Sequence, residues 1–175
     1  MRLFGTPLEE KIFKRFALFP ERSFFIAELA RKENLSVGTI HATIQIFLKD
    51  KFIILTDQKG KVKLYRLNST NPVVRQLKVL MVVFAISDFV MRIAPYTKKI
   101  FLFGSCARGE QTNESDIDLL VVTQDSLVLK NEVMPKKLPI TMITKTPSQW
   151  AEMEKKDPDF YREVIEGGIT LIKNI

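Results

Sequence analysis

Cysteine and histidine are almost absent from this sequence of 175 residues, which has one of each, Cys106 and His41. A single cysteine cannot form a disulfide within the chain, and a single histidine leaves no His/Cys cluster for zinc. Any bound metal must therefore be held mainly by carboxylates. Long hydrophobic runs are also missing, since the longest, Val79 to Ile86, is far shorter than the roughly 20 residues that a membrane-spanning helix needs.

The N-terminal segment has acidic residues within its first ten positions and lacks the apolar stretch of a secretory signal. We therefore expect a cytoplasmic protein with no membrane partner. Hydrophobic residues make up 46% and charged residues 27% of the chain, which is typical of a globular protein with a packed core.

Positive charge is concentrated in the first part of the chain. Residues 1–70 contain 13 basic and 7 acidic side chains, whereas residues 71–175 contain 14 and 13. A basic segment joined to a nearly neutral one suggests that the first part contacts a polyanion. Solubility alone would explain the same excess.

The first part has the pattern of three helices followed by a β-hairpin. Apolar spacing predicts helices over residues 8–19 and 24–33, and a third helix that begins after Ser36. In the third helix, Val37, Ile40, Ile44, Phe47 and Leu48 share one side, which we expect to be buried. Strand-like runs at 53–57 and 61–67 flank a turn over residues 58–60.

This order resembles the winged helix-turn-helix domains of many archaeal and bacterial regulators. The resemblance implies that the third helix enters the major groove of double-stranded DNA, where Thr39, Thr43 and Gln45 would reach base edges. The hairpin, or wing, would place Lys59, Lys61, Lys63 and Arg66 against phosphates. Alternating lysines on a hairpin are also common as a solvated edge. We expect His41, at the rim of the buried stripe, to be a packing residue.

Residues 71–95 form a predicted linking helix, with Asn71 as its N-cap and Pro72 in its first turn. Its middle is apolar on every side, which requires cover all round. We expect this helix to pair with its copy in a homodimer. The alternative is that the C-terminal domain covers it.

The chemistry-bearing motif follows this helix. A short strand, 99–103, leads into Gly104-Ser105, and a second strand opens with Asp116-Ile117-Asp118. Residues two apart in a strand face the same way, so the two aspartates should point together. Such a carboxylate pair suits Mg²⁺, which keeps waters or substrate phosphates among its ligands. Gly104 would allow a triphosphate to approach the backbone closely, and Ser105 would donate a hydrogen bond to it.

The segment FGSCARGEQTNESDIDLLVV resembles the signature of the DNA polymerase beta-like nucleotidyltransferase superfamily, and most closely its minimal members in bacteria and archaea. The resemblance implies an α/β domain with a mixed sheet over residues 96–175. It also implies transfer of a nucleoside monophosphate from a magnesium-bound NTP to a hydroxyl of a protein, an RNA or a small molecule. Asp116 and Asp118 would hold the metal, while Gly104, Ser105 and Arg108 would bind the nucleotide. For Arg108, a surface ion pair is an equal alternative.

Active members of this superfamily usually add a third carboxylate from a later strand, here 138–144, where Thr141 takes that position. Glu110, Glu114 and Asp125 are candidate substitutes. The missing acid leaves alternatives open: an impaired, nucleotide-sensing transcriptional regulator, or an antitoxin-like partner of a small toxin.

Overall fold

The computed structural model describes residues 4–126, 129 and 139–174, which fall into two compact units, Met1–Arg75 and Gln76–Ile175. We describe each unit by itself. None of the helices in these described residues combines the length and hydrophobicity needed to span a bilayer.

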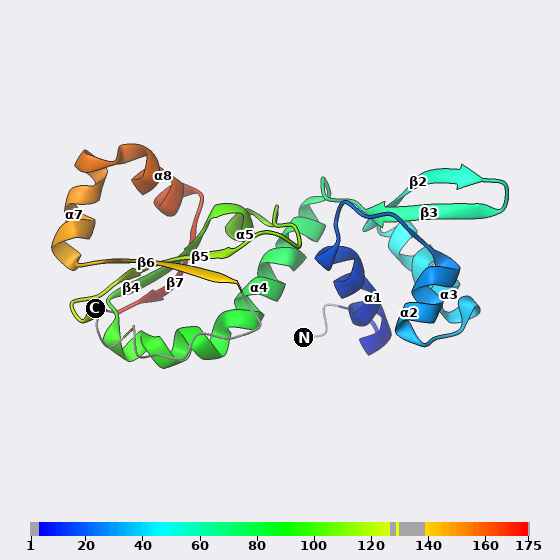
Figure 1. Ribbon diagram of the computed structural model, residues 1–175, viewed down its shortest axis with the longest axis horizontal. Helices are drawn as coiled ribbons and strands as arrows, with labels where there is room; N and C mark the ends of the chain where they lie inside the picture. The colour runs from blue at the N-terminus through cyan, green and yellow to red at the C-terminus, as the bar shows by residue number, and fades with distance from the viewer. Residues whose placement is uncertain (1–3, 127–128, 130–138, 175) are drawn as a thin grey trace. The chain divides into compact units, whose positions relative to one another are not determined.

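The first unit has three helices and a small antiparallel sheet (Figure 1). Aromatic side chains dominate its core, where the fully buried Phe13 and Phe47 rings meet edge to face. The elements in chain order are α1 (Pro7–Leu18), β1 (Phe24–Phe25), α2 (Ile26–Glu33), α3 (Val37–Lys49), β2 (Ile53–Lys59) and β3 (Val62–Leu67), with β3 between β1 and β2.

Local capping fixes the helix boundaries. The Thr6 hydroxyl accepts a hydrogen bond from the Glu9 N–H at the start of α1, and Ser36 does the same for the Thr39 N–H in α3. Asn34 ends α2 in the left-handed region, at φ 55°. These caps place α3 directly after a tight turn.

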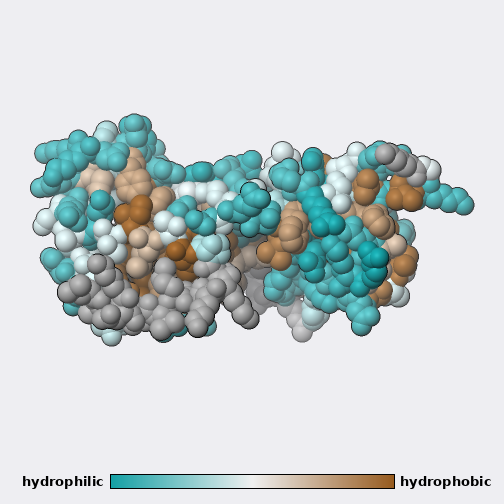
Figure 2. Space-filling view, viewed as in Figure 1, coloured by the Kyte–Doolittle hydropathy of each residue, from teal (hydrophilic) through white to brown (hydrophobic). Residues whose placement is uncertain are grey.

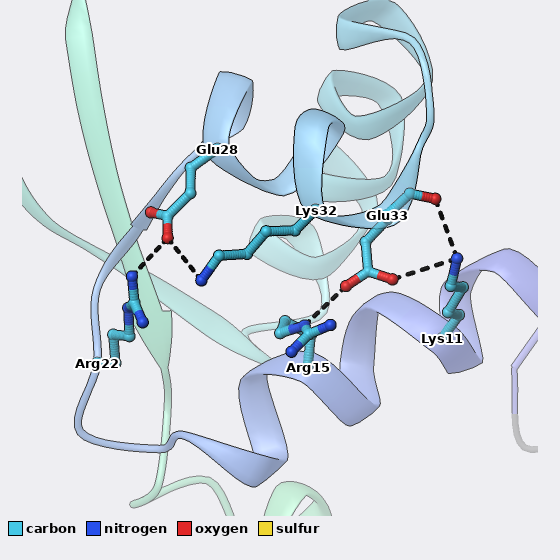
Figure 3. A network of polar contacts seen from close by, with 6 residues as sticks. All are labelled: Lys11, Arg15, Arg22, Glu28, Lys32 and Glu33. Atoms are coloured by element: carbon cyan, nitrogen blue, oxygen red, sulfur yellow. Dashed lines mark hydrogen bonds and ion pairs between the residues drawn. The ribbon is translucent and has the colours of Figure 1, made fainter.

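Two buried glutamates of α2 form ion pairs, and one of them, Glu33, connects α2 to α1 (Figure 3). Glu33 accepts a hydrogen bond from Arg15 at 2.7 Å and forms an ion pair with Lys11 at 3.2 Å, and both partners lie on α1. Glu28 pairs with Arg22 and Lys32. Because a buried carboxylate is costly unless it is paired, these contacts stabilise the packing of α2.

The hairpin differs in detail from the prediction. β2 continues through Lys59, so the turn lies at Gly60 and Lys61 rather than at 58–60, and Gly60 has a φ of 60°. A bulge between Leu55 and Asp57 gives β2 an extra residue. Sequence periodicity cannot reveal such a bulge, because the bulge changes strand pairing without leaving a required residue type.

The second unit is built on a four-stranded sheet in the order β6-β5-β4-β7. β5 and β6 run parallel and the other pairs are antiparallel, which confirms the predicted mixed sheet. Of the predicted strand 138–144, Leu138 lies outside the described residues. The elements are α4 (Pro72–Ile93), the 3₁₀ turn Ala94–Tyr96, β4 (Lys99–Phe103), α5 (Gly104–Arg108), β5 (Ile117–Val122), β6 (Ile140–Lys145), α7 (Pro147–Lys156), α8 (Pro158–Glu166) and β7 (Ile169–Lys173).

Helices cover both faces of this sheet, with α4 on one side and α7 and α8 on the other (Figure 1). Ile86 and Phe89 of α4 are buried in the same cluster as Leu102 and Leu119. The opposite cluster joins Phe101 and Leu120 to buried Trp150 of α7 and Val164 of α8. This sandwich fixes the edge of the sheet where β4 ends and β5 begins.

Among the residues that the structure describes, those that cover the middle of α4 lie on one side of it. Its inner face belongs to the core of the second unit, as the alternative interpretation expected, while Phe84 is 68% exposed. Within this part of the chain, the apolar middle of α4 is therefore not buried on every side, although its sequence predicts such burial. The homodimer stays a prediction.

Candidate active site

The turn after β4 meets the first residues of β5. Gly104 has a φ of 69°, and a Cβ atom placed on it would lie 2.6 Å from Oδ2 of Asp118. A side chain is excluded here both by the backbone conformation and by the carboxylate. The glycine thus allows the Gly104-Ser105 backbone to lie directly against an acidic side chain.

Strand register holds the carboxylates at this edge. Asp118 lies between Phe103 of β4 and Thr141 of β6, and it is half-buried. Asp116 immediately precedes β5 and is exposed, and its Oδ2 accepts a hydrogen bond from the Thr141 hydroxyl at 3.3 Å. The hydroxyl in place of the third acid therefore contacts Asp116 directly.

The charges at this edge repel one another. Burial raises the pKa of Asp118 above its ordinary value, and the negative charges of Asp116 and Glu163 raise it further. A site that disfavours its own ionised form gains most from a cation. Two carboxylates fit Mg²⁺, which also keeps water or phosphate ligands. The described residues contain no group of three or more His, Cys, Asp or Glu placed to hold a metal.

The residues after Gly104 have different environments. Ser105 is half-buried, while Cys106 is buried and donates a hydrogen bond to the Asp116 carbonyl at 3.2 Å. Burial, together with the negative charge of Asp118, raises the pKa of the Cys106 thiol to about 11. A thiol that stays protonated at neutral pH acts as a packing residue rather than a nucleophile.

Arg108 is exposed and forms ion pairs, at 3.0 Å with Glu110 and at 3.5 Å with Glu163 of α8. The ion-pair alternative is thus realised, and a triphosphate would have to compete with both carboxylates for Arg108. Among the proposed substitutes, Glu110 is engaged by Arg108 and Glu114 is exposed in the loop. Asp125 follows β5, and its N–H donates to the Thr123 hydroxyl.

Sequence reasoning missed Glu163. Its charge acts on Asp118, and its carboxylate reaches Arg108, although it lies 55 residues after Arg108 in the chain. No spacing in the sequence indicates this proximity, because it depends on how α8 packs over β4.

A second surface of interest is a hollow of about 410 Å³ in the first unit, between α3 and the hairpin. It combines apolar and basic side chains, and Figure 2 shows hydrophobic and hydrophilic residues close together along the hairpin. Its lining includes Phe25, Val37, His41, Gln45, Lys61, Val62 and Lys63.

Of the residues predicted to read bases, Gln45 is exposed in this hollow and Thr39 is half-buried, with its hydroxyl 2.7 Å from that of Ser36. Thr43 was predicted wrongly. It is only 3% exposed and donates its hydroxyl hydrogen to the Thr39 carbonyl, so it cannot reach a base.

The buried face of α3 differs from the predicted one, and this difference corrects two further expectations. Val37, expected in the core, is 56% exposed, and His41, expected to pack, is exposed beside Gln45. The buried face of α3 is centred on Ile40, Thr43, Ile44 and Phe47. Sequence periodicity placed Thr43 outside because its type is polar.

The four predicted phosphate contacts do not form one surface. Lys61 and Lys63 line the hollow, whereas Arg66 is half-buried and lies 3.9 Å from Glu21. An odd spacing in a strand puts Arg66 on the other face from Lys63. The side chain of Lys59 lies outside the described residues.

Comparison with known proteins tests the chemistry that this geometry suggests. Residues 88–174 match the family model described as polymerase beta, nucleotidyltransferase. A Methanocaldococcus jannaschii protein named "putative protein adenylyltransferase" is 36% identical over 77 residues, which cover 42% of this chain and 77% of that protein. The chain belongs to the polymerase beta nucleotidyltransferase family.

This nucleotidyltransferase segment contains the glycine turn, both aspartates, Thr141 and Glu163. A crystal structure from Sulfolobus solfataricus, titled "a putative nucleotidyltransferase", covers 59% of this chain and 87% of its own, with 18% identity and a TM-score of 0.36. A likeness at that level carries no weight for fold or function.

Proposed function

We propose that the second unit transfers a nucleoside monophosphate from a magnesium-bound NTP to a hydroxyl group of a protein. The observation that carries this proposal is the contact between the Gly104 backbone and the Asp118 carboxylate. It brings a close-approach turn for phosphates and a pair of carboxylates for the metal to one edge of the sheet.

Each residue has a defined task in this reaction. Asp116 and Asp118 would hold Mg²⁺, which when bound offsets negative charge on the phosphates. Gly104 leaves room for the triphosphate, Ser105 donates a hydrogen bond to it, and Arg108 exchanges its carboxylate partners for phosphate oxygens.

The transfer forms one bond and breaks one. The acceptor oxygen attacks the α-phosphorus and forms the new O–P bond, while the bond from that phosphorus to the bridging oxygen breaks. Pyrophosphate leaves with the electron pair, and the hydroxyl proton passes to solvent water. Thr141 cannot serve as the base because a hydroxyl is a poor proton acceptor at neutral pH.

The choice of a protein acceptor and of ATP rests on the relative from Methanocaldococcus jannaschii, whose name refers to adenylyl transfer to protein. Other NTPs and RNA or small-molecule hydroxyls are outcomes that the same assay detects.

A label-transfer assay tests the proposal. The protein is incubated with Mg²⁺, ATP labelled at the α-phosphate and candidate acceptor proteins, and pyrophosphate release is followed in parallel. We expect Asp118→Asn to reduce transfer on the order of 100-fold, because the metal supplies several kcal/mol of charge stabilisation. Asp159→Asn, at an exposed carboxylate of α8 paired with Arg162, is the matched control and should leave transfer unchanged. Equal activity of wild type and Asp118→Asn would contradict the proposal.

A nucleotide-binding regulator without turnover is the second candidate for this unit, favoured by the hydroxyl of Thr141 where an acid is usual. It predicts that Mg-NTP changes affinity for DNA without pyrophosphate release. An antitoxin-like role predicts instead that the chain binds a small toxin-like protein.

We also propose that residues 1–70 form a winged helix that binds double-stranded DNA. The element order, the excess of 6 positive charges and the exposure of Gln45, Lys61 and Lys63 around one hollow support this proposal. Thr39, Gln45 and also His41 would face base edges. Lys61 and Lys63 would contact phosphates.

The salt dependence of duplex binding tests this second proposal. Replacing Lys61 and Lys63 with alanine should weaken binding to all sequences and reduce the slope of log affinity against log salt by about 2, since each phosphate contact contributes about 0.9. Lys14→Ala, at an exposed lysine of α1, is the control. An unchanged slope in the double variant would rule out the hairpin as the phosphate contact.

A further inference from the structure

Lys78 on α4 is a buried lysine that contacts the loop leading to Asp116. Only 2% of it is exposed, and its ammonium nitrogen donates a hydrogen bond to the Gln111 carbonyl at 2.7 Å. The Gln111 side chain returns a hydrogen bond to the Lys78 carbonyl at 3.2 Å. These two bonds tie α4 to the loop between α5 and β5. Since a buried ammonium group is costly to desolvate, its place here needs an explanation.

The loop that Lys78 holds is the one that delivers Asp116. Within it, the Thr112 N–H donates to the Ser115 hydroxyl at 2.9 Å, and Asp116 follows directly. The Cys106 thiol donates a hydrogen bond to the Asp116 carbonyl. Lys78 therefore anchors the loop at Gln111, and Cys106 anchors it at its last residue.

The positive charge of Lys78 also acts on Cys106, which contacts Asp116. It lowers the pKa of Cys106, while burial and the charges of Asp118 and Asp116 raise it. All three charged groups thus act on one buried thiol. Lys78 precedes the family segment at 88–174, so its contact comes from a part of the chain that the family match does not include.

We propose that Lys78 is a positioning residue of the active site, which fixes the loop over residues 109–116 so that Asp116 stands beside Asp118 for metal binding. This inference rests on the proposed function of the two aspartates as metal ligands. It assigns the α4 segment a role in the site besides covering the sheet.

A double-mutant cycle on metal affinity tests this inference. Mn²⁺ binding is measured by electron paramagnetic resonance for wild type, Lys78→Met, Asp116→Asn and the double variant. We expect Asp116→Asn to weaken binding about tenfold in the wild-type background and less than about threefold in the Lys78→Met background, because the displaced carboxylate no longer contributes. Equal weakening in both backgrounds would overturn the proposal. Because the comparison is made within each background, the lost charge of Lys78 itself cancels.

Amide hydrogen exchange in the metal-free protein gives a readout that does not depend on catalysis. Lys78→Met should speed exchange in the loop over residues 109–116 and leave β4 and β5 protected. Lys155→Met, which removes a charge from the exposed surface of α7, should change neither. Uniformly faster exchange across the second unit would mark Lys78 as merely structural and overturn the proposal.

The two proposals fail in different ways. If no Mn²⁺ binds to the wild-type protein, the metal role of the aspartates fails, and loop exchange then decides whether Lys78 positions Asp116 at all. If Mn²⁺ binds and the cycle shows no coupling, only the role of Lys78 fails.

Discussion

At the scale of single residues, Thr141 separates this site from one with three carboxylates. Its hydroxyl contacts Asp116, and its strand position lies beside Asp118. An acid at this position would therefore stand next to both aspartates.

Thr141→Asp should convert this arrangement into a three-carboxylate site. Without metal, a third negative charge should lower the melting temperature, and Mg²⁺ should restore it because the cation offsets the repulsion. With Mg-ATP, we expect label transfer to rise on the order of 100-fold, the usual contribution of a positioned base. Thr144→Asp, on the opposite face of β6, should show neither effect. If Mg²⁺ does not change the melting temperature of the Thr141→Asp protein, this would argue against metal binding at this edge.

The sequence predicted the residues of the glycine turn and the aspartate pair because their chemistry requires fixed spacings along one segment. It failed for Glu163, whose charge acts on Asp118 from α8, and for Lys78, which contacts the loop before Asp116 from α4. In α3 it failed for Thr43, because a threonine can satisfy its hydroxyl on its own helix and be buried.

At the scale of elements, the contact between α1 and α2 depends on a buried carboxylate. Burial by itself would raise the pKa of Glu33, but hydrogen bonds from Arg15 and Lys11, with their positive charges, hold it below its ordinary value of 4.5. The unfolded chain binds a proton more readily than the folded one. This contribution to stability is therefore present above about pH 4.5 and is lost as the pH falls through the lower pKa of the folded state.

Glu33→Gln should lower the free energy of unfolding of the first unit by about 1–3 kcal/mol at neutral pH, because two charge-assisted hydrogen bonds are weakened. Near pH 3 the difference from wild type should shrink, since the native glutamate is then losing its charge. Chemical denaturation followed by circular dichroism at both pH values measures this. Glu10→Gln, at an exposed pair with Lys14, should cost less than about 0.5 kcal/mol. A Glu33→Gln deficit that does not depend on pH would contradict the ionic explanation.

The order of helices and strands was predictable because caps, periodicity and turn residues act locally. The lengths of β2 and of its turn were not, since the bulge near Thr56 is set by pairing with β3. The same holds for α4, whose apolar sequence suggested cover on all sides although its inner face alone is buried.

At the scale of the whole molecule, two units with different charge point to two kinds of partner. We propose duplex DNA as the partner of the basic first unit and a nucleotide as the ligand of the second, and the homodimer stays a prediction, with Phe84 and Met91 of α4 exposed. The central claim concerns the second unit alone. This claim is that the Gly104-Ser105 turn and the two aspartates together bind one metal-bound triphosphate.

A crystal structure of the protein with Mg²⁺ and a non-hydrolysable ATP analogue tests that claim most directly. We predict a magnesium ion about 2.1 Å from carboxylate oxygens of both Asp116 and Asp118, with the triphosphate against the backbone of Gly104 and Ser105. A nucleotide bound elsewhere, or a metal that touches neither aspartate, would contradict the account.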